Sequence, residues 1–128
     1  MAITVTSQTL ADGVKTAVMK FTAEVGGTEN EAAVKKVDVS ALSGAPSTVK
    51  IQRIWYATDG ISVKILFDAT ADVLAHTLPS TEANYLDFRS FGGIQNNAGT
   101  GVTGDIMFTT LGGTAGDSYT IILELSKT

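Results

Sequence analysis

The sequence predicts an all-β protein, a single-domain antiparallel β-sandwich of eight or nine short strands over residues 1–128. Apolar and polar residues alternate with a period of two in several segments, as they do on a strand with one buried face. Glycine-rich dipeptides separate these segments. The composition agrees, because 13 glycines against two prolines, with 44% hydrophobic residues, is typical of an ordered β protein with many tight turns. We expect a jelly roll or related Greek-key sandwich first and an open barrel second.

The alternation is clearest in three segments, which are Ala17–Val25, Ile61–Phe67 and Tyr119–Leu125. In the first segment the odd positions are apolar and the even positions are polar, with Val18 as the exception. Successive side chains of a strand point to opposite faces, so each segment has one face suited to a core. We expect four of these inward-facing side chains to share one core: Phe21, Ile65, Phe67 and Leu123.

Weaker strand patterns occupy six further segments: Ile3–Thr9, Val34–Val39, Val49–Thr58, Val73–Leu78, Tyr85–Phe88 and Thr103–Leu111. In Val49–Thr58 the apolar residues change face between Ile51 and Ile54, which indicates either a β-bulge or a strand buried on both faces. Thr28–Lys36 has a helical alternative, but its apolar content is too low to anchor a helix on a core. We therefore interpret it as a polar connection.

Turn residues predict how the strands are connected. Asp59-Gly60 lies between two strand segments and predicts a hairpin in which Gly60 has positive φ. Asp12-Gly13 predicts another hairpin near the start of the chain. The longest irregular stretch, Arg89–Val102, is rich in glycine and asparagine, and loops of this length in small domains are commonly interaction elements.

Catalytic and metal sites lack their usual residues. The chain has no cysteine and one histidine, His76, so a zinc site of ordinary composition cannot be assembled. We expect His76 to be structural and to share a strand face with Leu74 and Leu78. A calcium or glycosidase site has three candidate carboxylates, which are those of Asp59, Asp68 and Asp72. They lack calcium-loop spacing, so we interpret them as turn residues that accept hydrogen bonds from nearby backbone amides.

Two further motifs have a functional and a structural interpretation. Gly99–Gly104 resembles a phosphate-binding loop, but it lacks the Lys-Ser/Thr pair and precedes a strand, so we interpret it as a flexible approach to the strand at Thr103. Trp55-Tyr56 could stack on a sugar or a base, although a tryptophan in the middle of a strand is more often a core residue. We predict no catalytic, cofactor-binding or metal-binding residue, no cofactor, and a protein that is not an enzyme.

The distribution of charge and hydropathy along the sequence indicates which classes of partner to expect. The net charge is −4, and the nine Lys and Arg residues are scattered, with Lys35-Lys36 as the densest pair, so we expect no nucleic-acid partner. The start of the chain, Met1–Thr6, lacks the pattern of a signal peptide, and no stretch approaches the ~20 apolar residues of a membrane span. We expect synthesis in a cytoplasm and no membrane partner.

Residue order and spacing resemble a known group of proteins along nearly the whole chain. The resemblance is carried by Arg53–Gly60, Val63–Thr70, Leu86–Arg89, Phe91–Ile94, Asn96-Asn97, Thr103–Ile106, Phe108–Thr110 and Gly116–Ile121, with Ala2–Thr6 and Met19–Thr22 near the start. The group is that of small virion structural proteins of marine and cyanobacterial tailed bacteriophages.

The resemblance implies a decoration (cement) protein, located in the virion, that binds the major capsid protein on the outside of the head and stabilises the shell. A sandwich of short strands offers broad faces and edges for self-association, and the three-fold positions of a capsid would suit a homotrimer. We expect the outward-facing apolar residues Val18, Leu66 and Ile122 to contribute contacts. The alternatives are another virion element (a tail-tube, head–tail joining or fibre-associated subunit) and a carbohydrate-binding β-sandwich module.

Overall fold

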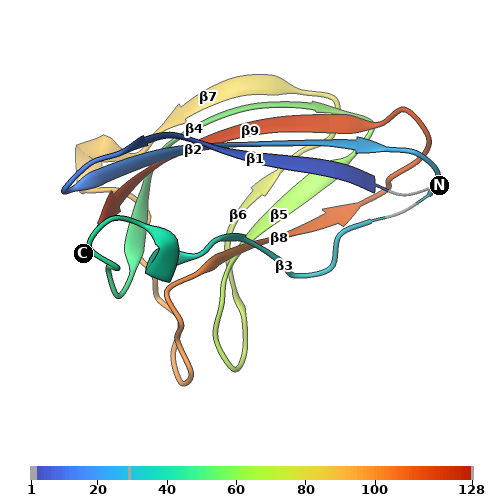
Figure 1. The fold of residues 1–128 in the computed structure, drawn as a ribbon. Helices are drawn as coiled ribbons and strands as arrows, with labels where there is room; N and C mark the ends of the chain where they lie inside the picture. The colour runs from blue at the N-terminus through green and yellow to red at the C-terminus, as the bar shows by residue number, and fades with distance from the viewer. Residues whose placement is uncertain (1–2, 29, 128) are drawn as a thin grey trace.

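The computed structural model describes residues 3–28 and 30–127, which form nine strands in two antiparallel sheets packed face to face (Figure 1). The five-stranded sheet contains, in spatial order, β1 (Ile3–Asp12), β2 (Thr16–Val25), β9 (Ser118–Lys127), β4 (Val49–Asp59) and β7 (Ala83–Asp87). The four-stranded sheet contains β3 (Val34–Val37), β8 (Ile106–Leu111), β5 (Ser62–Phe67) and β6 (Val73–Leu78). Two 3-10 helices, η1 (Val39–Ala41) and η2 (Arg89–Phe91), lie in connections. Among the described residues, no helix has the length and apolar character needed to cross a membrane.

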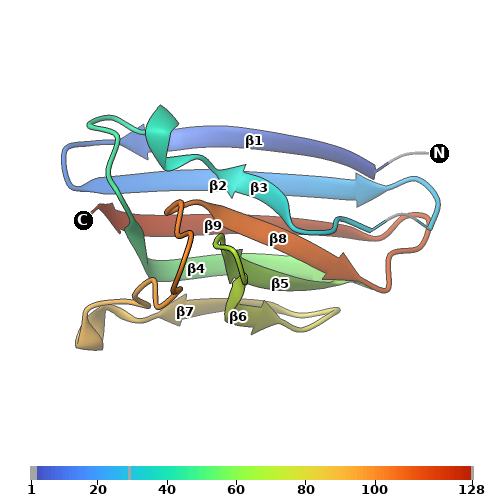
Figure 2. The same cartoon turned by 90° about the horizontal axis from the view of Figure 1, so that it is seen from below.

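The strand order is that of a jelly roll. The row β2-β9-β4-β7 faces the row β3-β8-β5-β6, which is the eight-strand arrangement produced by two Greek keys (Figure 2). β1 adds a ninth strand at the edge of the larger sheet, beside β2. The predicted all-β sandwich is therefore confirmed, and the open barrel is not the fold.

The core lies between the two sheets and is built from the inward positions of the strands. The four side chains expected there are all buried, with at most 1% of the surface of Phe21, Ile65, Phe67 or Leu123 exposed. Aromatic edges contact one another in this core, and the rings of Phe21 and Phe108 meet nearly at right angles with centroids 5.3 Å apart. The period-two alternation thus predicted the correct faces of β2, β5 and β9.

A β-bulge explains the change of face in β4. The register of β4 against β9 shifts between Ile51 and Arg53, so Gln52 is the additional residue. Val49 and Ile51 before the bulge and Ile54 after it are consequently all buried on the same inner side. The bulge interpretation is confirmed over a strand buried on both faces.

The Asp59-Gly60 turn does not make a hairpin. Gly60 has φ of 75°, as predicted, but β4 and β5 belong to different sheets, so this turn carries the chain across the sandwich. Turn chemistry reports the local backbone conformation and not which strands pair, and the hairpin prediction was wrong for that reason. Asp12-Gly13 does join two paired strands, and the amide of Gly13 donates to the carbonyl of Thr16 at 2.8 Å.

Some strand boundaries differ from those predicted. The strand expected over Val34–Val39 ends at Val37, because Val39 begins η1 and the Asp38 side chain caps it by accepting from the amide of Ser40. The strand expected from Thr103 begins at Ile106. The described residues of Thr28–Lys36 contain no helix, as predicted, but the connection ends where β3 begins at Val34; Glu29 lies outside the described residues.

Candidate functional site

Trp55 lies on the outer face of the five-stranded sheet. Its neighbours Ile54 and Tyr56 point into the core, so the indole points the other way and is half-buried. The interpretation of Trp55 as a core residue is therefore wrong. The bulge at Gln52 is the physical reason, because an unbroken strand would have placed Trp55 on the same side as Ile51.

Trp55 forms an aromatic pair with Tyr85. The two residues lie directly opposite each other on β4 and β7, and their rings stack with centroids 5.2 Å apart and planes inclined by 23°. The Arg53 guanidinium lies 4.9 Å from the Trp55 ring centroid, within the range of a cation–π contact. Hydrogen bonds to Tyr85 and to the Glu124 carboxylate raise the pKa of Arg53. The positive charge of Arg53 is thus neutralised by Glu124 of the same sheet.

A second ion pair holds the edge of the sheet beside Tyr85. The Tyr85 hydroxyl donates to Asp87 at 3.2 Å, and the Arg89 guanidinium donates to the same carboxylate at 2.8 and 2.9 Å. The hydrogen bonds from Arg89 hold the pKa of Asp87 well below its usual range. These contacts orient Tyr85 although it is 43% exposed on an edge strand.

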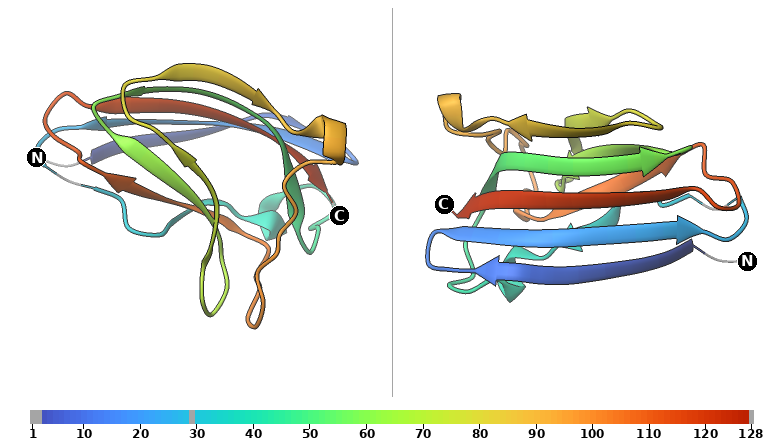
Figure 3. Two further views of the ribbon diagram at one scale, coloured as in Figure 1. Left: turned by 180° about the vertical axis from the view of Figure 1, so that it is seen from behind. Right: turned by 90° about the horizontal axis from the view of Figure 1, so that it is seen from above.

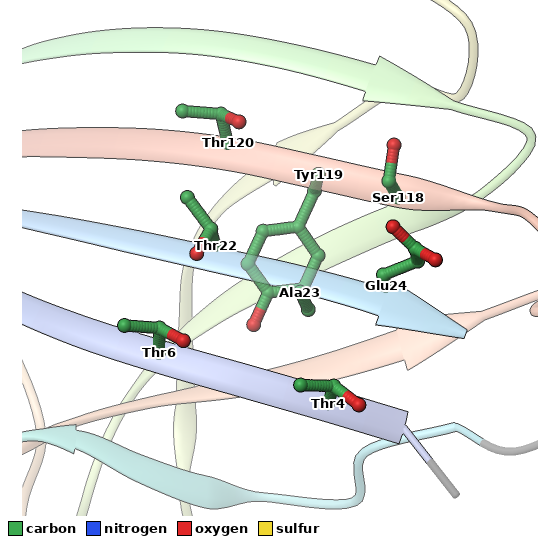
Figure 4. A pocket seen from close by; sticks show the side chains of 8 residues that line it. All are labelled: Thr4, Thr6, Thr22, Ala23, Glu24, Ser118, Tyr119 and Thr120. Carbon is green, nitrogen blue, oxygen red and sulfur yellow. The ribbon is translucent and has the colours of Figure 1, made fainter. Parts of the chain in front are cut away.

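Two hollows lie in the same outer face. The first, of about 290 Å³, is lined by Trp55, Tyr56, Ala57, Ala83, Asn84, Thr120 and Ile122. The second, of about 320 Å³, is lined by Thr4, Thr6, Thr22, Ala23, Glu24, Ser118, Tyr119 and Thr120 (Figure 4). Because both contain Thr120, they meet, and we call the residues that line the two hollows the outer groove.

Strand register explains the shape of the outer groove. One row of small side chains crosses all five strands, because each of these residues lies opposite the next: Thr6, Thr22, Thr120, Ala57 and Ala83. The adjacent row contains larger side chains: Lys20, Ile122, Trp55 and Tyr85. The smaller row forms the floor. Ile122 and Trp55 of the larger row line one wall, and Lys20 and Tyr85 flank them on the neighbouring strands. The right-hand view of Figure 3 looks onto this face of the sheet.

His76 lies on β6, at the edge of the four-stranded sheet. It is half-buried on β6, its ring is 5.8 Å from that of Phe88, and burial lowers its pKa. It shares the inner side with the buried Leu78, as predicted. Leu74 instead points outward and is 49% exposed, because the register of β6 shifts at Ala75. The expectation for Leu74 was wrong for that reason.

The three candidate carboxylates do not come together. Asp72 accepts a 3.1 Å hydrogen bond from the amide of Ala69, as expected of a turn residue. Asp68 accepts from the hydroxyl of Thr103 at 2.8 Å, and Asp59 is exposed at the end of β4. Over residues 3–28 and 30–127, no three His, Cys, Asp or Glu side chains are grouped as a metal site would require.

The Gly99–Gly104 segment is bonded to the β5–β6 connection, and the two loops hang side by side below the sandwich (Figure 1). The amide of Thr70 donates to the carbonyl of Thr100 at 3.1 Å, and the amide of Thr103 donates to the carbonyl of Asp68 at 3.2 Å. At Gly101 a Cβ atom would lie 2.1 Å from the Thr70 hydroxyl, so glycine permits this close approach. The segment is therefore hydrogen-bonded to the neighbouring loop on its way to β8.

A buried cluster of polar side chains, which we did not predict, lies inside the sandwich. Lys36, one half of the densest basic pair of the sequence, is buried and forms an ion pair with Glu31. The Tyr119 hydroxyl donates to Glu31 at 2.6 Å, and burial together with this bond raises the pKa of Tyr119. The register of β3 shifts between Lys35 and Val37, and this shift turns Lys36 inward. A period-two pattern contains no signal for it.

Comparisons with known proteins give no family. No family model matches the chain, and no curated protein matches it. Among solved structures, it is similar to a cupin superfamily protein from Desulfitobacterium hafniense, with 10% identity and a TM-score of 0.34 over 97% of this chain and 77% of that one. It is also similar to peruvianin-I, a cysteine peptidase from Thevetia peruviana latex, with 8% identity and a TM-score of 0.37 over 98% of this chain and 62% of that one. Similarity at this level supports no functional conclusion.

Proposed function

We propose that this protein is a non-catalytic structural subunit of a tailed-phage virion, a decoration protein that binds the outer surface of the head and stabilises the shell. The proposal starts from the residue order and spacing that resemble such proteins. The structural observation that supports it is the free edge of β1, a surface suited to joining one protein chain to another.

β1 is a long edge strand whose one protective device, a β-bulge at Leu10, lies near its end. It has ten residues and pairs with β2 on one side, and no described strand pairs with its other side. Natural edge strands usually carry lysine, proline or inward-pointing charges that discourage pairing with another chain. Between Ile3 and Ala11 this strand has no charged residue and no proline. Its free backbone groups therefore favour addition of a strand from a neighbouring chain.

The inner side of β1 is also uncovered. Val5 lies opposite Ala23, whose side chain is buried, so Val5 points toward the inner side of the sandwich. It is nevertheless 44% exposed, because the facing edge strand β3 has four residues and leaves β1 overhanging (Figure 2). Leu10 on β1 and Val34 on β3 are also exposed. A partner strand here would gain backbone hydrogen bonds and bury apolar surface together.

Two kinds of partner suit this edge, and the proposal includes both. The major capsid protein would anchor the subunit on the head, and other copies of the chain would complete an oligomer. Pairing of β1 with its own copy across a two-fold axis would give a dimer. Pairing of β1 with a different edge, such as β3 or β7 of the next copy, would give a ring where the rotation between copies closes, and we favour a trimer because a capsid has three-fold positions. The outward-facing Val18, Leu66 and Ile122 do not form one contact patch, since Leu66 lies on the opposite sheet from the other two.

Mass spectrometry of purified particles tests this function. A decoration protein should be present in a number of copies comparable with that of the major capsid protein, and particle reconstruction should locate it on the head exterior. A small number of copies would favour a tail or head–tail joining element. Absence from particles would overturn the virion role altogether.

A charge on β1 tests the proposed interface. Val5→Lys places a lysine on the open edge without disturbing a buried residue, and we expect it to reduce binding to undecorated heads by about tenfold or more. Ser90→Lys, which adds the same charge at the exposed η2 turn, is the matched control and should bind as the unmodified protein does. Equal binding by both variants would exclude β1 as the contact.

A further inference from the structure

We propose that the outer groove binds a neutral polysaccharide, with Trp55 and Tyr85 as the stacking wall and the threonine row as the hydrogen-bonding floor. This inference goes beyond the virion role and does not rest on it, since it concerns a binding site on the isolated subunit. It rests on the outward position of Trp55, on the two hollows that meet at Thr120, and on the charges around them.

The wall of the outer groove contains two stacked aromatic side chains. Trp55 is half-buried yet lines one of the hollows, and Tyr85 is stacked against it on the neighbouring strand. A sugar ring has an apolar face of C–H groups and a rim of hydroxyls, so an aromatic ring at the side of a groove can cover the first while the second stays hydrogen-bonded. The contacts from Arg53 and Asp87 hold the pair in place before any ligand arrives.

The floor of the outer groove offers free hydrogen-bonding groups. Within the described residues, the side-chain hydroxyls of Thr6, Thr22 and Thr120 form no hydrogen bond to the protein. Each hydroxyl can donate and accept, as can the hydroxyls of a sugar. Figure 4 shows these three side chains in line across β1, β2 and β9. Such a row can follow a chain of repeating sugars and satisfy its hydroxyls.

The charges around the outer groove select a neutral ligand. Glu24 is the charged residue among those that line the two hollows, and no lysine or arginine lines either of them. Arg53, beside the wall, already forms an ion pair with Glu124. A nucleic acid or sulfated glycan needs several unpaired cations along its path, whereas Lys20 is the one lysine beside the groove and Glu24 offsets its charge.

The length of the outer groove favours an oligosaccharide over a single sugar. The floor crosses five strands, and neighbouring strands lie about 4.8 Å apart, so the row from Thr6 to Ala83 spans about 19 Å. A monosaccharide would occupy only part of such a groove. We therefore expect affinity to rise with the number of sugar units until the groove is filled.

Affinity electrophoresis and tryptophan fluorescence test the site. The purified protein would be run through gels containing laminarin, dextran, xylan or galactomannan, with alginate as the acidic counterpart. We expect retardation by at least one neutral polysaccharide and none by alginate. Trp55 is the one tryptophan of the chain, so titration with oligosaccharides from the retarding polymer should change a fluorescence signal that comes from the site itself.

Variants separate this site from nonspecific binding. Tyr85→Ala keeps the fluorescent reporter and removes an exposed wall residue, and Trp55→Ala removes the central one; each should weaken binding by about tenfold or more. Trp55→Phe should restore part of the affinity, which separates loss of stacking from loss of folding. Phe91→Ala removes an aromatic side chain that is 66% exposed outside the groove, and it should bind normally. Migration unaffected by all four neutral polymers, or retardation that persists in both Tyr85→Ala and Trp55→Ala, would overturn the proposal.

Discussion

The hydroxyl of Tyr119 donates a 2.6 Å hydrogen bond to the Glu31 carboxylate, and the same carboxylate forms an ion pair with Lys36 inside the sandwich. At most 9% of the surface of any of these residues is exposed. Glu31 is also held by its backbone, because its amide donates to the Thr110 hydroxyl at 2.7 Å. The cluster joins the chain before β3 to strands β8 and β9, and it places a charged pair where a jelly roll normally has apolar side chains.

Glu31→Ala should be strongly destabilising. It leaves the Lys36 ammonium buried without its partner, and breaking a buried pair in this way costs about 3–5 kcal/mol. Urea denaturation followed by circular dichroism measures the change. Glu24→Ala, which removes a carboxylate from an exposed position, is the control and should change stability by less than about 0.5 kcal/mol.

A double variant shows whether the ion pair is the cause. Glu31→Leu with Lys36→Met replaces both charges by apolar side chains, and we expect it to regain most of the stability lost in Glu31→Ala. If the double variant is less stable than Glu31→Ala, the packing around the cluster, and not the unpaired charge, determines the effect.

Stability should fall in alkaline solution. Burial and the bond to Glu31 raise the pKa of Tyr119 above the ordinary 10.0, and burial with a hydrogen bond to Glu82 raises the pKa of Tyr56 to about 12. The unfolded chain therefore loses these protons first as the pH rises. The stabilisation is fully present below pH 10.0 and is lost progressively as the pH rises from there through the pKa values of the folded state. Urea midpoints measured on both sides of this pH should show the decline.

Phenylalanine variants identify the groups responsible for that decline. Tyr119→Phe should reduce the pH dependence and Tyr119→Phe with Tyr56→Phe should reduce it further. Tyr85→Phe removes an exposed hydroxyl and should keep the profile of the unmodified protein. An unchanged profile in the double variant would contradict the assignment to these two tyrosines.

Gly60→Val should destabilise the fold by about 1–3 kcal/mol, because a β-branched residue is strained at the φ of 75° found there. A Cβ atom would also lie 2.3 Å from a carboxylate oxygen of Asp117, which is held by hydrogen bonds from Thr114. Thermal unfolding measures the loss. Gly99→Ala is the control, since a Cβ atom there meets nothing within 4 Å and its φ lies outside the left-handed region.

Phe67→Ala should cost about 3–5 kcal/mol, because the ring is completely buried in the core between the sheets. Phe91→Ala, at a position that is 66% exposed, should leave the melting temperature nearly unchanged. Equal effects of the two substitutions would mean that β5 presents the other face to the core.

The strand pattern was predictable where a strand is regular over its whole length. In β2, β5 and β9 no bulge interrupts the inward positions, so a single periodicity identifies the buried side chains, Phe21, Phe67 and Leu123 among them. The face to which each of these side chains points follows from the residues next to it in the sequence. No knowledge of the partner strand is needed.

The candidate site could not be predicted, because it depends on the positions of β-bulges and on which strands pair. Extra residues at Gln52 in β4 and at Ala75 in β6 reverse the faces that follow, and a bulge is defined only against the strand that it pairs with. The turn at Gly60 has the conformation that its sequence predicts, but the sheets that it connects are set by nonlocal pairing. By itself, the sequence determined the all-β class, the regular strands and most of the core. Tertiary structure decided that Trp55 faces outward beside Tyr85 and that Lys36 faces inward toward Glu31, because both orientations depend on register between strands distant in the chain.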